Sequence, residues 1–121
     1  MIDHVALYVT DIDRSRRFYE QALEAVGYTV AMERESFVGF RQEGGPMFAV
    51  RSGKEATATA HIAFQVRDRA TVDAFHAAAV GAGGTDEGPP GVREHYHASY
   101  YAAFVADPDG NNIEAVCHKP A

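Results

Sequence analysis

The chain has 121 residues, which suits one domain or two small halves that share a core. Hydrophobic residues make up 46% and charged residues 23%, an ordinary globular composition that excludes wholesale disorder. The net charge is −6 and Lys and Arg form no run, so we expect neither nucleic acid nor an anionic membrane as a partner. One cysteine, no secretory-type leader and no apolar run long enough for a membrane helix predict a soluble, cytoplasmic protein.

An internal repeat is the main organising feature of the sequence. Residues 4–27 align without a gap with residues 61–84 at an offset of 57, and eight positions are identical. Chance would give about one or two at typical residue frequencies. The ends of the halves align at an offset of 66, residues 41–50 over 107–116, so the second half carries about nine extra residues.

The repeat predicts two similar modules that pack on each other within one domain. We place the first module at residues 1–52, a small and polar linker at 53–59, and the second module at 60–121. Two copies are too few for a solenoid.

The first half predicts a strand, a helix and further strands, in that order. Residues 4–9 alternate with a period of two, as in a half-buried strand. Asp11 or Asp13 can cap a helix with apolar residues at helical spacing, and Gly27 suits its C-terminal end. Short β-rich runs follow at 28–32, 36–40 and 46–50.

The second half predicts the same order of elements. Residues 61–66 alternate, and Asp68 can cap a helix whose buried face carries Val72, Phe75 and Ala79. Two strands are predicted at 99–105 and 112–116, joined by a hairpin turn at 107–110. The intervening segment, 87–97, is rich in Pro and Gly and predicts a loop that holds two histidines.

Three residues at matched places are candidate metal ligands. His4 and His61 occupy equivalent positions, so a pseudo-twofold would make their imidazoles face each other across a shared cavity. Glu114 lies in the last predicted strand, and the offset of 66 makes Phe48 its counterpart. Two histidines and one carboxylate can hold a divalent metal and leave other positions open for water or substrate. A lone strand His or Glu is more often structural or solvated, so the matched placement carries this hypothesis.

Hydrogen-bonding rings gather in the extra segment of the second half. We take His97 and Tyr101 as catalytic candidates that orient a substrate or move a proton, with Tyr96 and Tyr100 as substrate contacts. We expect residues 87–101 to close over the metal. The alternative is a surface loop or a dimer contact, since such rings are favoured at interfaces.

Two residues of the first half complete the candidate substrate contacts. Phe48 would supply an apolar wall opposite the metal. Arg51, which follows the last strand of the first module, would balance an anionic substrate or simply be a surface arginine.

The sequence resembles the vicinal oxygen chelate superfamily, which includes glyoxalase I, bleomycin-resistance proteins and extradiol dioxygenases. The matching segments are residues 1–23, 61–84 and 103–116, and the most specific element is DPDGNNIE. The resemblance implies an α+β fold of paired βαβββ modules that form a cup-shaped mixed sheet with helices outside. It places metal ligands at His4, His61 and Glu114, for one divalent ion such as Zn, Mn, Ni or Fe(II).

The resemblance also implies a class of function. It suggests a metal-dependent lyase, isomerase or dioxygenase whose small substrate chelates the metal through two oxygens. Phe48 stands where we place the acidic fourth ligand of glyoxalase I, which argues against that activity. The alternative is a metal-free, drug- or ligand-binding dimer of the bleomycin-resistance type. In either case we expect a homodimer, with the modules exchanged between chains or not.

Overall fold

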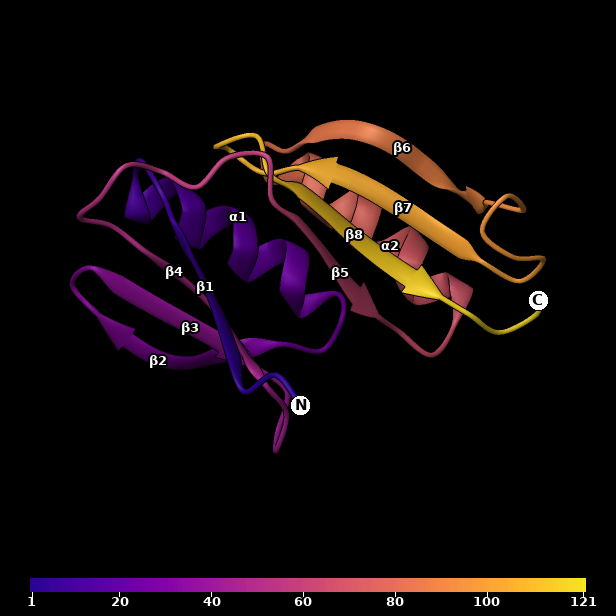
Figure 1. Cartoon of the computed structure of the whole chain (residues 1–121), viewed down its shortest axis with the longest axis horizontal. Coiled ribbons are helices and arrows are strands. Elements are labelled where there is room, and N and C mark those ends of the chain that lie inside the picture. Colours follow the sequence, from indigo (N-terminus) through magenta and orange to yellow (C-terminus); the bar gives the residue numbers. More distant parts are fainter.

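The computed structural model describes residues 1–121 as two βαβββ modules, which confirms the predicted α+β fold (Figure 1). The first module comprises β1 (His4–Tyr8), α1 (Ile12–Glu24), β2 (Thr29–Arg34), β3 (Phe37–Arg41) and β4 (Met47–Arg51). The second comprises β5 (His61–Gln65), α2 (Arg69–Gly81), β6 (Thr85–Val92), β7 (Tyr101–Ala106) and β8 (Asn112–Cys117).

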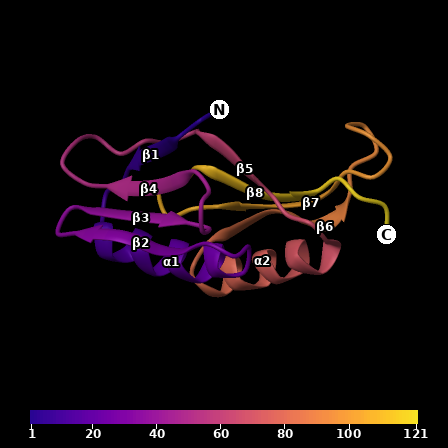
Figure 2. The same ribbon diagram turned by 90° about the horizontal axis from the view of Figure 1, so that it is seen from below.

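Each module forms its own four-stranded mixed sheet. The strand orders are β1-β4-β3-β2 and β5-β8-β7-β6, and only the pairs β1–β4 and β5–β8 are parallel. Strands β1 and β5 are therefore edge strands of their sheets. Both helices lie on one side of the sheets, and the other side carries no second layer (Figure 2). We call this uncovered side the open face.

The two helices begin where the sequence predicts. The side chain of Asp11 accepts a hydrogen bond from the backbone N–H of Arg14, and Asp68 does the same for Thr71. Each helix has 13 residues, and neither is long and apolar enough to span a membrane.

Apolar side chains from both modules build one core beneath the sheets. Helices α1 and α2 pack against each other. The ring of Phe64 lies 5.2 Å from that of Tyr28 and 5.6 Å from that of Phe48, which joins β5 to the first module. A shared core is expected, because a module of this size buries too little apolar surface alone.

The turn between β7 and β8 fastens the second module to the first. The buried hydroxyl of Tyr19 in α1 donates a hydrogen bond to Asp107, and the hydroxyl of Thr10 donates to Asp109 at 2.6 Å. The amide of Asn111 accepts from the backbone N–H of Ala60 and donates to the carbonyl of Thr57. The segment that carries the family resemblance thus has a structural role at the joint between the modules.

The predicted loop at 87–97 is partly wrong. Residues up to Val92 belong to β6, and only 93–100 form the connection to β7. Pro89 and Pro90 fit because β6 is an edge strand, whose outer side needs no N–H donors. The pairing with β7 is also irregular between Asp86 and Gly91.

The predicted equivalence of Glu114 and Phe48 is wrong by one residue. In the parallel pair β5–β8, Glu114 lies opposite Ala63. In β1–β4, Ala6, which matches Ala63 in the repeat, lies opposite Ala49. Ala49 is therefore the counterpart of Glu114, and Phe48 points to the other face, because successive side chains of a strand alternate.

Candidate metal centre

His61 and Glu114 meet on the open face of the second sheet. His61 starts β5 and Glu114 lies in β8, and the parallel register of the two strands brings them together. His61 Nε2 lies 2.7 Å from Glu114 Oε1. The His61 side chain is 53% exposed, whereas that of Glu114 is 1% exposed. The His61 imidazole is thus accessible from solvent, whereas the Glu114 carboxylate is buried.

The second oxygen of Glu114 is held by Tyr100. The hydroxyl of Tyr100 donates a hydrogen bond to Glu114 Oε2. Burial, followed by this bond to the carboxylate, raises the pKa of Tyr100 well above its usual range, so the hydroxyl keeps its proton. Phe104, opposite Glu114 in β7, lies with its ring 6.2 Å from that of His61. The carboxylate therefore presents Oε1 alone towards His61.

His4 lies apart from this pair. Its side chain is 62% exposed, and its hydrogen-bond partner is its own neighbour Asp3, at 2.8 Å. No three His, Cys, Asp or Glu side chains of the chain lie close enough together to hold a metal ion. The structure thus brings together two of the three predicted ligands within one chain, and the third faces solvent at the start of β1.

The two residues predicted to be catalytic lie outside this pair. Tyr101 points away from the open face, where its hydroxyl donates to Asp73 of α2 at 2.6 Å. The prediction that Tyr101 reaches the site is wrong, and alternation along the strand is the reason. His97 lies with Nε2 at 2.9 Å from His118 Nδ1, and its ring is 5.4 Å from that of Tyr100. His97 therefore contacts Tyr100, which in turn contacts Glu114.

The predicted substrate contacts lie at different places. Phe48 is 3% exposed, with its ring 4.9 Å from that of Tyr19, and it lines the apolar groove that also borders His61. Tyr96 is exposed, and its ring lies 4.7 Å from that of Tyr100 at a tilt of 47°. Arg51 ends β4 at the far end of the first sheet. Of these residues, Tyr100 alone contacts a predicted metal ligand, Glu114. The many rings in this segment indicated a role near the site, but they did not show which ring contacts which ligand.

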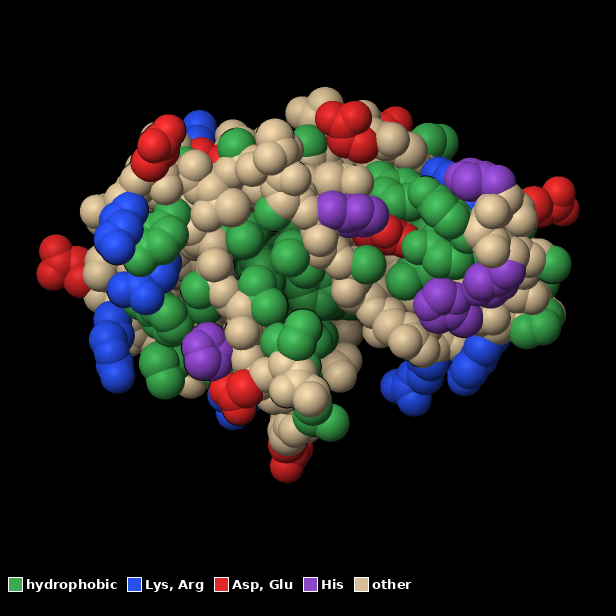
Figure 3. Space-filling view, viewed as in Figure 1, with side chains coloured by type: hydrophobic (Ala, Val, Ile, Leu, Met, Phe, Trp, Pro, Cys, Tyr) green, Lys and Arg blue, Asp and Glu red, His purple; other side chains and the backbone are tan.

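An apolar groove runs between the modules beside His61. It has a volume of about 340 Å³, and Ile2, Val5, Met47 and Phe64 line it together with His61. Figure 3 looks onto this face and shows the apolar hollow at its centre, with histidines distributed around it. The groove gives a small organic ligand an apolar surface next to a polar pair, as is typical of ligand sites.

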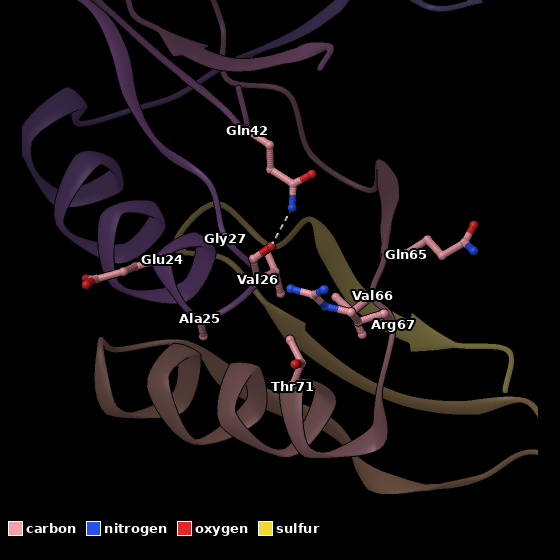
Figure 4. A pocket seen from close by; sticks show the side chains of 9 residues that line it. All are labelled: Glu24, Ala25, Val26, Gly27, Gln42, Gln65, Val66, Arg67 and Thr71. Atoms are coloured by element: carbon pink, nitrogen blue, oxygen red, sulfur yellow. Dashed lines mark hydrogen bonds between the residues drawn. The ribbon is translucent and has the colours of Figure 1, made fainter. Parts of the chain in front are cut away.

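A second hollow, of about 490 Å³, lies where α1 ends and α2 begins (Figure 4). Its lining is largely polar and includes Glu24, Arg67 and Thr71. The amide nitrogen of Gln42 is already used there, since it donates to the carbonyl of Val26 at 3.0 Å. None of the predicted ligands lines this hollow.

Comparison with known proteins places the chain in a family. A model of the Glyoxalase/Bleomycin resistance protein/Dioxygenase superfamily matches residues 1–115. The chain belongs to this superfamily. A glyoxalase/bleomycin resistance protein from Albidiferax ferrireducens is 31% identical, with a TM-score of 0.87 over 98% of this chain and 99% of that one. No curated protein matches the sequence.

More distant solved members share the fold. A glyoxalase/bleomycin resistance protein/dioxygenase family enzyme from Burkholderia phytofirmans is 20% identical, with a TM-score of 0.76 over 97% of this chain and 98% of that one. A lactoylglutathione lyase from Agrobacterium tumefaciens is 21% identical, with a TM-score of 0.71 over 96% of this chain and 92% of that one. At these identities the likeness shows a shared fold.

Proposed function

We propose that this protein is a metal-dependent enzyme that acts on a small substrate with two adjacent oxygens, and that two copies of the chain complete its site. His61 and Glu114 of one copy and His4 of the other would be the ligands. The convergence of His61 Nε2 and Glu114 Oε1, 2.7 Å apart on an open face, is the observation that carries this proposal.

The donor types fit a divalent ion. Imidazole nitrogen and carboxylate oxygen together suit Zn, Mn, Ni or Fe(II). The ion, when bound, supplies charge stabilisation to substrate oxygens that become negative during the reaction. Within the chain, Tyr100 fixes the Glu114 carboxylate, and the ring of Phe104 lies beside that of His61. The apolar groove receives the carbon skeleton of the substrate.

Two features support a second copy as the source of the third ligand. His4 lies on the open face of the first sheet, on edge strand β1, and is not engaged by any residue of the second module. Its counterpart His61 lies on edge strand β5. A twofold dimer that sets β1 of one chain beside β5 of the other would bring these side chains together. It would create two equal sites.

Mixing two defective variants tests the shared site. His4→Ala and His61→Ala are each expected to lose bound metal when purified alone, measured by mass spectrometry. In a mixed dimer, one of the two sites receives His4 from the second variant and His61 with Glu114 from the first, so it is intact. Co-refolded variants should therefore regain up to one metal per mixed dimer.

A site within one chain would behave differently. Each chain of the mixture would then still carry one lesion, and no metal would return. His76→Ala, which removes a histidine of α2 that pairs with Asp86 on the helix side of the sheet, is the matched control and should keep full metal content. Full metal content in either single variant would remove that residue from the ligand set.

The apolar groove favours a second candidate function, a metal-free binding protein. In that case the His61–Glu114 pair is only a hydrogen bond at the edge of the groove. A wild-type protein that rejects Zn²⁺, Mn²⁺, Ni²⁺ and Fe²⁺ in titration, yet binds an apolar aromatic compound, would support this candidate. Metal uptake with the ligand dependence described above would exclude it.

A further inference from the structure

An arginine on the open face of the first sheet lies between two aromatic rings. Arg51 of β4 is paired in register with Tyr8 of β1 on one side and with Phe37 of β3 on the other. Its Cζ lies 5.2 Å from the centre of the Tyr8 ring and 5.9 Å from that of Phe37. Rings on both sides limit the orientations open to the guanidinium, which lowers the entropy cost of binding a ligand with it.

The hydrogen-bonding capacity of this arginine is unused. The Arg51 side chain makes no hydrogen bond and no ion pair within the chain. The two rings contact the guanidinium but accept none of its N–H groups. A guanidinium presents five donors in a fixed fork that matches a carboxylate or a phosphoryl group. An oriented and unpartnered fork is therefore ready to bind an anion.

A second cation lies close by. The Lys54 Nζ lies 5.8 Å from the centre of the same Tyr8 ring. Lys54 also forms no ion pair, although the chain has an excess of acidic residues. Figure 3 shows Lys and Arg side chains gathered at the end of the open face that belongs to the first sheet. Two like charges near one ring repel each other, and a bound anion relieves this repulsion.

We propose that Tyr8, Phe37, Arg51 and Lys54 form an anion-binding subsite for the carboxylate or phosphoryl group of a small molecule. That this molecule is the substrate rests on the proposed function, whereas anion binding itself does not. Tyr8 follows His4 by four residues in β1, so both side chains lie on the open face, roughly 13 Å apart along the strand. The substrate would carry its anionic group at the end remote from the chelating oxygens.

The test uses the metal-free, full-length protein and follows the side-chain Nε–H signals of arginine by NMR. Inorganic phosphate and acetate are titrated separately, which distinguishes phosphoryl from carboxylate recognition. We expect a saturable shift of the Arg51 signal with at least one of them, weakened by added salt. Arg51→Gln, followed through the backbone N–H signals of Tyr8 and Phe37, should lower the affinity at least about tenfold, since charge-assisted hydrogen bonds are lost.

Arg41→Gln is the matched control. Arg41 ends β3 with an exposed side chain and has no ring contact, and its loss should leave the affinity unchanged. Equal losses in both variants, or shifts that do not saturate, would mean general charge attraction and overturn the proposal. Absence of a shift, combined with a weaker dimer in Arg51→Gln, would overturn it too and assign Arg51 to a contact between copies. Failure of metal binding would refute the proposed function while leaving these shifts intact.

Discussion

Tyr100 and Tyr101 are neighbours in the sequence, yet their hydroxyl groups serve opposite faces of the second sheet. Tyr100 donates to Glu114 on the open face, and Tyr101 donates to Asp73 of α2 on the helix side. The pair therefore offers a natural comparison, because the same substitution at adjacent positions removes one hydroxyl near the candidate metal centre and one remote from it.

Tyr100→Phe is expected to lower metal affinity about 10- to 100-fold, the usual effect of removing a hydrogen bond that orients a ligand. The fold should survive, since the ring stays. Competition with a chromophoric chelator measures the affinity, and circular dichroism monitors the fold. Tyr101→Phe should leave the affinity unchanged, and equal losses in the two variants would show that Tyr100 does not position Glu114.

Tyr19→Phe should destabilise the protein by about 1–3 kcal/mol, because buried Asp107 loses a hydrogen-bond donor. The free energy of unfolding in urea measures this loss. Tyr28→Phe is the control, since the Tyr28 hydroxyl has no hydrogen-bond partner in the chain. We expect a change within about 0.5 kcal/mol for that variant. Similar values for both would mean that the bond across the modules contributes little.

Ala49→Glu and Phe48→Glu test the register of β4. Glu at position 49 takes the place that matches Glu114, on the open face. Ala49 is itself buried, so we expect a loss of stability there too, but a smaller one, because no second layer covers this side of the sheet. Glu at position 48 buries a charge among the rings of Tyr19 and Phe64 and should cost more than about 4 kcal/mol. Urea unfolding compares the two. A more stable Phe48→Glu variant would contradict the register.

The cap of α2 predicts a pH dependence of stability. Hydrogen bonds from the side chain and backbone of Thr71 lower the pKa of Asp68 below its ordinary value of 3.8. The stabilisation is complete above that ordinary value and is lost as the pH falls through the lowered pKa of the folded state. The gap in Tm between wild type and Asp68→Ala should therefore be constant at neutral pH and shrink in acid. A difference in Tm that stays constant down to pH 2 would show that the negative charge of Asp68 does not contribute to the stability of the cap.

Local signals in the sequence predicted most of the fold. Asp68 caps α2, and the predicted Val72, Phe75 and Ala79 are its buried residues, because helix caps and periodic apolar residues are local properties. The turn at 107–110 joins β7 to β8 as predicted. Strand β6 was missed, because Pro and Gly usually mark loops and only its place at a sheet edge makes them acceptable.

The candidate site was less accessible to sequence reasoning. Sequence reasoning placed His61 and Glu114 on one face of the second sheet. The extra residues in the second module made the alignment of its last strand with β4 uncertain. An error of one residue in that alignment made Phe48, and not Ala49, the counterpart of Glu114. Whether His4 lies near His61 depends on how two modules, or two chains, are arranged. No periodicity in a single chain contains that information.

The contacts between the β7–β8 turn and the first module have a consequence for folding during translation. Tyr19 leaves the ribosome 88 residues before its partner Asp107, and Thr10 leaves it 99 residues before Asp109. The joint can close only after residue 109 has emerged, so we expect the first module to stay partly open until then. Shortening the chain before residue 107 should leave a nascent product that proteases readily degrade.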